Sequence, residues 1–456
     1  MARPSTSLAE HIRALAGFSA EWESASLPAE VEHFGRVLLL DTIGALVGAT
    51  RYEAVDRLRD TLGTTNVEDS APFALLFRLG TAATWLDADS GGSFHPQGHR
   101  LPPVPTAHPG PHVLPVLLHH ALRGVPDADL LRIFVLSVEI GMRFGTATSL
   151  RPGLHPHGIH GPVAAAAAES LLRGHDVDLT ADSIARALTT PVAARLWQPM
   201  HGGTVRNAWT GIGGYYGARA AVEAEWRRET SSKSVDAAVT SVFTKDTEVD
   251  LLSDGLGSRW VFLDSYLKPY ACARWIHPAL DAARLALSEK RPAGDGKQIE
   301  SIDVETFAFA ASLQALAELR TDLHARFDLP TCMATFALDR ELHAPAFLPE
   351  LLGRPEVAAL RERVTARENP DFTAALPSER PTTVTITWRE GERTQGMVRN
   401  ATGNPDRPMS LEQVLEKFKA NVDSVLPEHV AQWCVEWGRG LAQQHAVLKQ
   451  VAEVVA

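Results

Sequence analysis

The amino-acid sequence changes character near residue 266, and this change most constrains the fold. From residue 5 to about 265, apolar residues recur at helical spacing, as at Val31, Phe34 and Val37. After residue 266, "IESIDVETF" from Ile299 alternates between apolar and polar residues as a strand does. A chain of 456 residues is also too long for one compact core. We therefore expect at least two structural parts.

The second part has further strand signals, and the end of the chain is helical again. "TTVTITWREGERTQGMVR" from Thr382 predicts a β-hairpin that turns at Glu390 and Gly391. Ser410 and Gln413 have the spacing of a capping box at the start of a late helix. We predict a mainly α protein with a large all-α helical domain and a smaller α+β lid domain. The expected boundaries are 1–265 for the helical domain, 266–402 for the lid and 403–456 for C-terminal helices that return to the helical domain.

Individual helix ends are also predicted. Ser26 is expected to cap a helix, with Pro28 just inside it. A second helix is expected over "GPVAAAAAESLLRG", with Pro162 at its first position and Gly174 just past its end. Its alanines either allow close packing against neighbouring helices or are simply good helix formers.

Composition excludes several functional classes. The formal net charge is −11, from 44 basic and 55 acidic residues, so no basic field favours nucleic acid. No apolar run is long enough for a membrane span, and the N-terminal stretch is not typical of a signal peptide. The three cysteines, Cys272, Cys332 and Cys434, lie far apart and form neither a disulfide framework nor a zinc pattern. We expect a cytoplasmic protein whose partner is a small molecule, without nucleic-acid or membrane partners.

Three histidines gather in "RPGLHPHGIHGPVAAAAAES", which begins at Arg151. His155 and His157 precede the expected helix, and His160 lies at its start. A metal site, a solvated polar loop and acid/base or anion-binding groups all remain open here. The third has a specific physical basis, because a helix N-terminus attracts carboxylates and disfavours imidazolium. A histidine held there is neutral at pH 7 and able to accept a proton.

A long loop between two helices carries more titratable residues. "LDADSGGSFHPQGHRLPPVPTAHPGPHVLP" from Leu86 is rich in proline, glycine and histidine, and loops of this length are usually functional or disordered. Asp87 and Asp89 are either helix caps or functional carboxylates. The histidines of this loop cannot all be core residues; they are His95, His99, His108 and His112.

Two further segments carry the cations that an anionic ligand needs. "WQPMHGGTVRNAW" from Trp197 places His201 before two glycines and Arg206 in the helical turn beyond. "LKPYACARWIHPALDAA" from Leu267 brings Lys268, Arg274 and His277 together where the composition changes. A junction between two domains is a common place for a small-molecule site, although a basic surface cluster is the alternative interpretation.

Taken in order, these segments resemble the MmgE/PrpD family, which includes 2-methylcitrate dehydratase, cis-aconitate decarboxylase and iminodisuccinate epimerase. "LHPHGIHGPVAAAAA" is similar to the family's H-P-x-x-x-x-G-x-x-x-A-A-A stretch, and "YLKPYACARWIHPALDAA" is similar to its most specific signature. The resemblance covers nearly the whole chain. It implies a large helical domain with a smaller α+β lid, no cofactor and usually a homodimer. It also implies proton transfer at a carbon next to a carboxylate.

The resemblance assigns roles to individual residues. It makes Asp87, His108, His155, Lys268 and His277 the expected catalytic residues, and His201 matches a family histidine. With Arg206 and Arg274, the local cations noted above, His201 and Gln198 are the expected substrate-binding residues; no metal ligand is assigned. Gln198 stands where the family usually has a lysine. The loss of this positive charge makes a tricarboxylate substrate less favoured.

The favoured function is a cofactor-independent lyase that dehydrates or decarboxylates a di- or tricarboxylate. An epimerase of an amino- or imino-dicarboxylate, a non-catalytic carboxylate-binding relative and a metal-dependent hydrolase are the alternatives.

Overall fold

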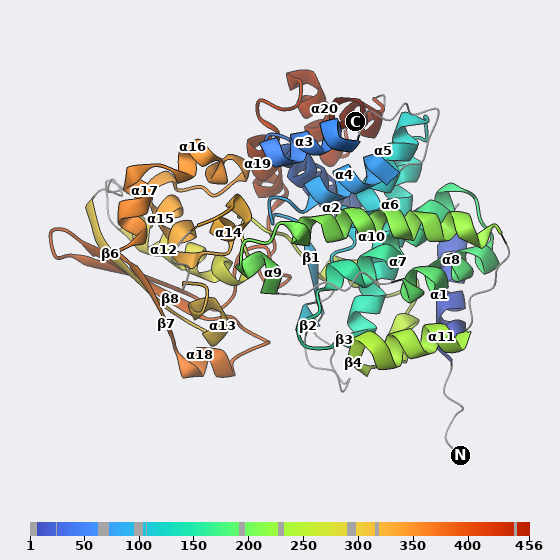
Figure 1. The fold of residues 1–456 in the computed structure, drawn as a ribbon, viewed down its shortest axis with the longest axis horizontal. Coiled ribbons are helices and arrows are strands. Elements are labelled where there is room, and N and C mark those ends of the chain that lie inside the picture. The colour runs from blue at the N-terminus through green and yellow to red at the C-terminus, as the bar shows by residue number, and fades with distance from the viewer. Residues whose placement is uncertain are drawn as a thin grey trace, which may run out of the picture.

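The protein has a large helical part and a smaller part built around a β-sheet (Figure 1). The structure is a computed structural model that describes residues 7–23, 25–62, 73–94, 104–105, 107–190, 197–226, 232–289, 298–314, 319–441 and 445–456. None of the helices in these ranges is long and apolar enough to cross a membrane. The mainly α fold class predicted from the sequence is confirmed.

Within the described residues, twelve α-helices precede the sheet. They are α1 (Leu8–Glu23), α2 (Ala29–Ala49), α3 (Glu53–Leu62), α4 (Phe73–Ala83), α5 (Gly110–Leu122), α6 (Asp127–Ala147), α7 (His160–Leu172), α8 (Val177–Thr189), α9 (Trp197–Met200), α10 (Val205–Ala224), α11 (Ser232–Ala237) and α12 (His277–Glu289). The later helices are α13 (Ala308–Ala311), α14 (Asp322–Arg326), α15 (Leu329–Asp339), α16 (Pro349–Leu352), α17 (Pro355–Arg361), α18 (Pro370–Ala374), α19 (Leu411–Val422), α20 (Glu428–Gly438) and α21 (Val447–Val455).

Small residues let the central helices α4, α7 and α10 pack closely. The five alanines of α7 are completely buried. A Cβ atom at Gly217 of α10 would lie only 2.2 Å from the carbonyl oxygen of Pro162, and one at Gly211 would lie 2.2 Å from that of Phe77 in α4. The alanine run therefore serves close helix packing, and it brings the N-terminus of α7 into the protein interior.

The second part is a four-stranded sheet with the order β7-β6-β8-β9. Its strands are β6 (Ile299–Thr306), β7 (Val364–Glu368), β8 (Thr382–Trp388) and β9 (Arg393–Val398). β6 pairs parallel to β7 and antiparallel to β8, and the predicted β8–β9 hairpin is confirmed with Gly391 at a positive φ of 84°. Alternate residues of β8 are buried, as the sequence alternation predicts. Helix α12 packs on β8 and β9.

Short strands also occur within the first 266 residues, in addition to the helices predicted there. They are β1 (Gly91–Phe94), β2 (Val104–Pro105), β3 (Thr148–Leu150), β4 (Thr244–Thr247) and β5 (Ser265–Tyr266). Gly91 of β1 pairs with Tyr266 of β5. This pairing places the loop after α4 directly beside the segment that begins the second part of the chain.

The buried apolar residues form separate clusters. One cluster combines α2, α4, α5 and α6 with the C-terminal helices α19, α20 and α21, and another combines α12 and α15 with the inner face of the sheet. Figure 1 shows α19 and α20 beside α2 and α3, away from the sheet. On this separation we propose domain boundaries near residues 266 and 403.

Predicted helix ends are confirmed in two places and wrong in two others. The Ser410–Gln413 capping box is present, and Gly174 follows α7 with a φ of 67°. Ser26 is not a cap, because the chain stays extended up to Pro28, which is itself the N-cap of α2. Pro162 is the third residue of α7, which begins at His160; an N–H there has no intrahelical partner, so proline is tolerated.

Candidate active site

A cavity of about 330 Å³ lies between the helical part and the sheet-bearing part. Its volume lies at the small end of the range typical of ligand sites. The residues that line it are Asp87, His108, Thr148, Ser149, Leu150, Leu154, His155, Pro156, His160, Pro199, Arg206, Tyr266, Lys268, Ala273, Arg274, Trp275 and Phe327. Three of these side chains are cations and one is a carboxylate, so the charged lining favours an anionic ligand.

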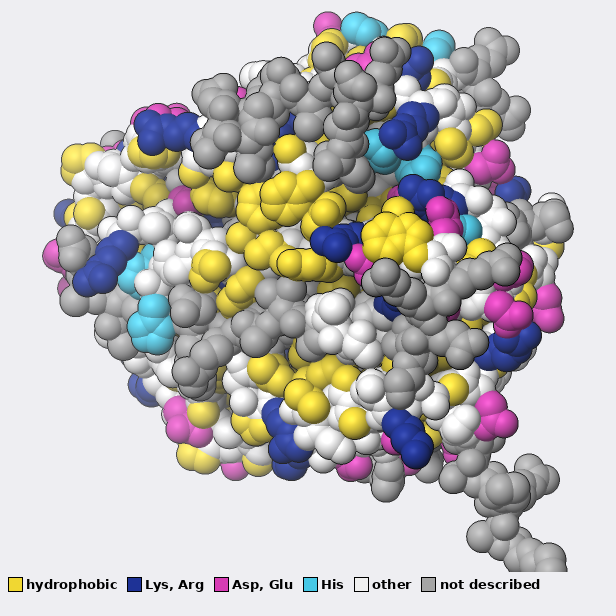
Figure 2. All heavy atoms as spheres, turned by 45° about the vertical axis from the view of Figure 1, so that its right-hand side comes forward, with side chains coloured by type: hydrophobic (Ala, Val, Ile, Leu, Met, Phe, Trp, Pro, Cys, Tyr) yellow, Lys and Arg dark blue, Asp and Glu magenta, His cyan; other side chains and the backbone are white. Residues whose placement is uncertain are grey.

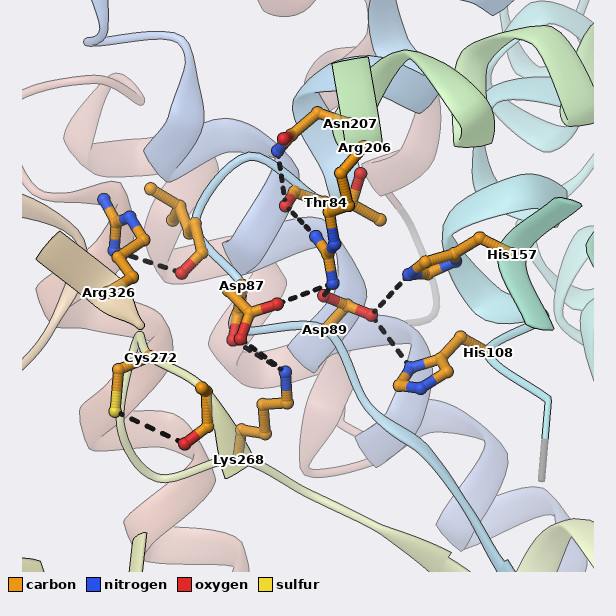
Figure 3. Close-up of polar contacts among 12 residues, drawn as sticks. Thr84, Asp87, Asp89, His108, His157, Arg206, Asn207, Lys268, Cys272 and Arg326 are labelled. Carbon is orange, nitrogen blue, oxygen red and sulfur yellow. Dashed lines mark hydrogen bonds and ion pairs between the residues drawn. The ribbon is translucent and has the colours of Figure 1, made fainter. Parts of the chain in front are cut away.

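The loop that follows α4 is held by buried cations from distant parts of the chain. Asp87 has a positive φ of 50°, which is strained for a residue other than glycine. Backbone carbonyl oxygens on both sides of it accept hydrogen bonds from charged side chains. Arg206 donates to Thr84, Arg326 to Leu86, Lys268 to Asp87 and Lys417 to Ala88, at 2.7, 3.0, 2.8 and 3.1 Å. Three of these four donors are drawn in Figure 3.

The side chain of Asp87 bridges two of these cations. Its Oδ1 accepts from Nη2 of Arg206 at 2.5 Å, and its Oδ2 accepts from Nζ of Lys268 at 3.2 Å. All three side chains are almost completely buried. Burial lowers the pKa of Lys268, but the carboxylates of Asp87 and Asp89 outweigh it and raise that pKa above its usual value. The ammonium therefore stays charged at the cavity wall.

Asp89 orients the imidazole of His108. The Nδ1 atom of His108 lies 2.9 Å from Oδ2 of Asp89 and 2.9 Å from the carbonyl oxygen of Ser90. A carbonyl oxygen can only accept, so Nδ1 carries the hydrogen. In the neutral ring the lone pair is consequently on Nε2, which faces the hydroxyl of Tyr266 at 3.3 Å.

Two features support this arrangement of Asp89 and His108. Burial raises the pKa of Asp89, but Lys268, the hydrogen bond with His108 and Arg206 outweigh it and hold that pKa well below its usual value. A Cβ atom at Gly91 would lie 2.7 Å from both the His108 ring and the Tyr266 hydroxyl, so only glycine fits beside this pair. Asp89 thus remains ionised and His108 is confined.

His155 also lines the cavity, and its neutral ring is the opposite tautomer to that of His108. The backbone N–H of His157 donates to Nδ1 of His155 at 3.3 Å, so the hydrogen of the neutral ring is on Nε2. Burial, together with the charges of Arg206 and His108, holds the pKa of His155 well below its usual value. His155 is therefore a neutral N–H donor, whereas His108 offers a lone pair.

Arg274 supplies the third cation of the cavity. Its guanidinium stacks 3.5 Å above the ring centroid of Tyr266, and its Nη2 donates to Oδ1 of Asn404 at 2.6 Å. The buried Nη1 has no hydrogen-bond partner among the described residues. Arg274 therefore has a donor left for a ligand carboxylate.

A second group of imidazoles lies behind His108. The ring centroid of His157 is 4.8 Å from that of His108, and Nε2 of His157 is 3.6 Å from Oδ2 of Asp89. The ligand atoms of Asp89, His108 and His157 all lie within 4.8 Å of one another. Figure 3 shows Asp89 between the two histidines and Arg206. These residue types and distances are compatible with a metal ion as well as with acid–base chemistry.

Most of the residues predicted to be catalytic or substrate-binding meet at the cavity, but the described residues His201 and His277 do not. Asp87, His108, His155, Arg206, Lys268 and Arg274 all line it. His201 is exposed and does not line the cavity. His277 is buried away from the lining, with Nε2 3.1 Å from the carbonyl oxygen of Cys272. The Gln198 side chain lies outside the described residues, as do His95 and His99, although Pro199 beside Gln198 lines the cavity.

Two residues of the site have no specific role in the sequence predictions. The sequence leaves Asp89 open between a helix cap and a functional carboxylate, because its contact with His108 depends on how the loop folds. Tyr266 reaches the site because β5 pairs with β1. Its position two residues before Lys268 in an alternating segment was the available signal.

The fold and cavity define a mainly helical, two-part protein with a cavity lined by cations and histidines. Sequence models of the MmgE/PrpD N-terminal domain and the MmgE/PrpD C-terminal domain match residues 13–232 and 270–455. The chain belongs to the MmgE/PrpD family. Comparison with curated proteins gives no match.

Proposed function

We propose that the protein is a lyase that abstracts a proton next to a carboxylate of a di- or tricarboxylate, without a cofactor, and then expels water or CO₂. The observation that carries the proposal is that Nε2 of His108, the ring nitrogen with the lone pair, and three cationic side chains line the same cavity. A carbanion next to a carboxylate develops charge on oxygen, and fixed cations stabilise it. Membership of a family of enzymes supports the same conclusion.

In the proposed reaction His108 is the general base. Its Nε2 lone pair takes the carbon-bound proton, which makes the ring an imidazolium. Asp89, which contacts Nδ1 of this ring, stabilises the positive charge. The hydroxyl of Tyr266, 3.3 Å from Nε2, helps to hold the His108 ring in position for this transfer. His155 remains neutral and donates a hydrogen bond from Nε2 to the oxygen on which charge develops. The proton that His108 has taken is then delivered to the leaving hydroxyl, which departs as water, or to the carbon from which CO₂ is lost.

The cations divide into two groups around the proposed substrate. Lys268 and Arg206 both bind the Asp87 carboxylate, which fixes their positions. In the proposed reaction their positive charges stabilise the enolate-like oxygen. Arg274 lies on the other side of Tyr266 and has a buried, unpaired N–H at Nη1 within the described structure. We assign it to a second carboxylate, because a guanidinium and a carboxylate match geometrically. The substrate class thus has at least two carboxylates.

An epimerase of an amino- or imino-dicarboxylate is the second candidate. It shares the first step, and it needs a second group that returns a proton to the opposite face. The N–H of His155 is in a position to do so, since the rings of His108 and His155 are 6.2 Å apart at their centroids. The substitution of glutamine for a lysine at Gln198 favours a substrate with fewer carboxylates.

We also propose a homodimer. Exposed large apolar side chains on α4 and α10 include Phe73, Val205 and Tyr216, which are 38%, 49% and 41% exposed. Figure 2 shows hydrophobic side chains gathered near the centre of one face of the molecule. A second copy of the chain is the proposed partner, and light scattering of the purified protein measures its mass directly.

The function is tested by proton NMR in D₂O with a panel of citrate, 2-methylcitrate, cis-aconitate, iminodisuccinate and aspartate-derived compounds. We expect one of them to exchange a carbon-bound proton for deuterium or to give product signals. The product separates dehydration, decarboxylation and epimerisation. Absence of both exchange and product with every compound would contradict the proposed function.

A further inference from the structure

The buried cluster behind the cavity contains more metal-ligand atoms than the proposed reaction uses. His157 is completely buried, and neither of its ring nitrogens has a hydrogen-bond partner among the described residues. Asp89 is equally buried, and its Oδ2 faces both His108 and His157. An unpaired imidazole in the interior loses hydrogen-bond energy unless a partner compensates it. The cluster is therefore arranged for a further partner.

The distances suit a transition-metal ion. Two ligands of a tetrahedral zinc ion with bonds of about 2 Å lie about 3.3 Å apart. Oδ2 of Asp89 is 2.9 Å from Nδ1 of His108 and 3.6 Å from Nε2 of His157, which brackets that value. The three ligand atoms lie within 4.8 Å of one another, so a small rotation of one ring completes the set.

We propose that Asp89, His108 and His157 form a binding site for one divalent transition-metal ion of the Zn²⁺ or Co²⁺ type. Two imidazoles and one carboxylate are typical ligands of these ions. Arg206 lies 3.7 Å from Oδ1 of Asp89, which leaves Oδ2 for the metal.

The surrounding charges set the expected affinity. Arg206 and Lys268 balance Asp87 and Asp89, so the four fixed charges sum to zero before a dication enters. The ion also displaces the hydrogen bond from His108 to the carbonyl oxygen of Ser90. We therefore expect reversible binding, weaker than that of a structural zinc site.

The ion has a predictable effect on turnover, and this part rests on the proposed function. Coordination at Nδ1 of His108 displaces the proton from that nitrogen, and the neutral ring then carries its proton on Nε2 through exchange with solvent. No net proton is lost from the ring. Nε2 becomes a donor and no longer accepts the substrate proton, so the metal-bound protein is inactive.

Cobalt binding tests the site without any substrate. Protein is treated with a chelator, dialysed and titrated with CoCl₂, and the visible absorption of bound cobalt gives stoichiometry and affinity. His157→Gln and Asp89→Asn remove one ligand each. His120→Gln is the matched control, because it removes a different contact between a histidine and a carboxylate, 3.0 Å from Glu169. Circular dichroism confirms that each variant is folded.

We expect the wild type and His120→Gln to bind one cobalt ion per chain, and zinc to displace it. His157→Gln and Asp89→Asn should bind at least tenfold more weakly. Wild-type protein that binds no cobalt at one ion per chain would overturn the site, as would undiminished binding by whichever of the two ligand variants is folded. Because the readout is absorption, a failed metal site leaves the proposed catalytic function standing, and an inactive protein still reports metal binding.

Discussion

Asp89 and His108 form a buried pair in which Oδ2 of the carboxylate lies 2.9 Å from Nδ1 of the imidazole. This contact, with the carbonyl oxygen of Ser90, fixes the hydrogen on Nδ1 and the lone pair on Nε2. Asp89 does not line the cavity, so it acts on the substrate only through His108. Asp89 therefore orients the base, and His108 is the member of the pair that lines the cavity.

Asp89→Asn should lower kcat by about 100-fold or more, because the imidazolium loses its stabilising charge and the ring is less well oriented. KM should change little, since Asp89 does not line the cavity. Steady-state kinetics measure both constants. Asp250→Asn is the control, as it removes the carboxylate 3.3 Å from His11 in another part of the chain. Equal effects of the two substitutions would contradict the role of Asp89.

Tyr266→Phe should lower kcat about tenfold, the scale of one lost hydrogen bond. The ring that stacks on Arg274 remains, while the hydroxyl 3.3 Å from Nε2 of His108 is lost. Tyr270→Phe is a matched control, because its hydroxyl instead donates to Asp281 at 2.6 Å. If Tyr266→Phe has wild-type kcat, the hydroxyl has no part in catalysis.

Arg274→Lys should raise KM about tenfold or more with a smaller change in kcat, because a hydrogen bond to a charged group is worth about 1.5–3 kcal/mol. Lysine keeps the charge but loses the planar group that stacks on Tyr266. Arg284→Lys provides the comparison, since Arg284 lies 5.9 Å above the ring centroid of Tyr270, outside the cavity lining. An unchanged KM in Arg274→Lys would remove Arg274 from substrate binding.

Stability should fall as the pH decreases below 6.5. Burial lowers the pKa of both His112 and His160 from 6.5 to about 3. Between these values the unfolded chain binds protons that the folded chain does not, so the free energy of unfolding decreases by up to about 1.4 kcal/mol per pH unit for each such group. Above pH 6.5 both states are neutral and these histidines contribute no pH dependence.

Chemical unfolding at pH 4.5, 5.5, 6.5 and 7.5 measures this slope. His160→Gln should reduce it, because one buried histidine is removed while the amide can still reach the hydroxyl of Thr148, 2.9 Å from Nε2. His429→Gln, on the surface helix α20, should leave the slope unchanged. A wild-type stability that is constant from pH 4.5 to 6.5 would show that these rings are protonated in the folded state.

The sequence predicts the architecture well because local patterns determine it. The helical and strand periods of the apolar residues separate the two parts of the chain. Arg206, Lys268 and Arg274 could be identified because an acidic protein that binds an anion needs local basic residues around it. Close packing also accounts for a glycine of α10, since a Cβ atom at Gly213 would lie 2.9 Å from the His112 ring.

The rest of the site depends on tertiary geometry. Asp87 and Asp89 are only two residues apart, yet Asp87 binds Arg206 whereas Asp89 contacts His108. The positive φ of Asp87, which sequence spacing does not reveal, is part of this loop conformation. Spacing alone does not reveal that His277 turns to the carbonyl oxygen of Cys272, or that His201 points to solvent. Both stay predictions from the family resemblance, and the geometry gives them no direct contact with the cavity.

If Nε2 of His108 abstracts a carbon-bound proton, removing that nitrogen should stop isotope exchange at the substrate carbon. We would measure the rate of deuterium exchange into the responsive carboxylate in D₂O for wild type, His108→Gln and His429→Gln, which changes an exposed histidine on α20. Folded His108→Gln should lose about 100-fold or more of the exchange rate, and His429→Gln should exchange as wild type does. Wild-type exchange in folded His108→Gln would show that His108 is not the base.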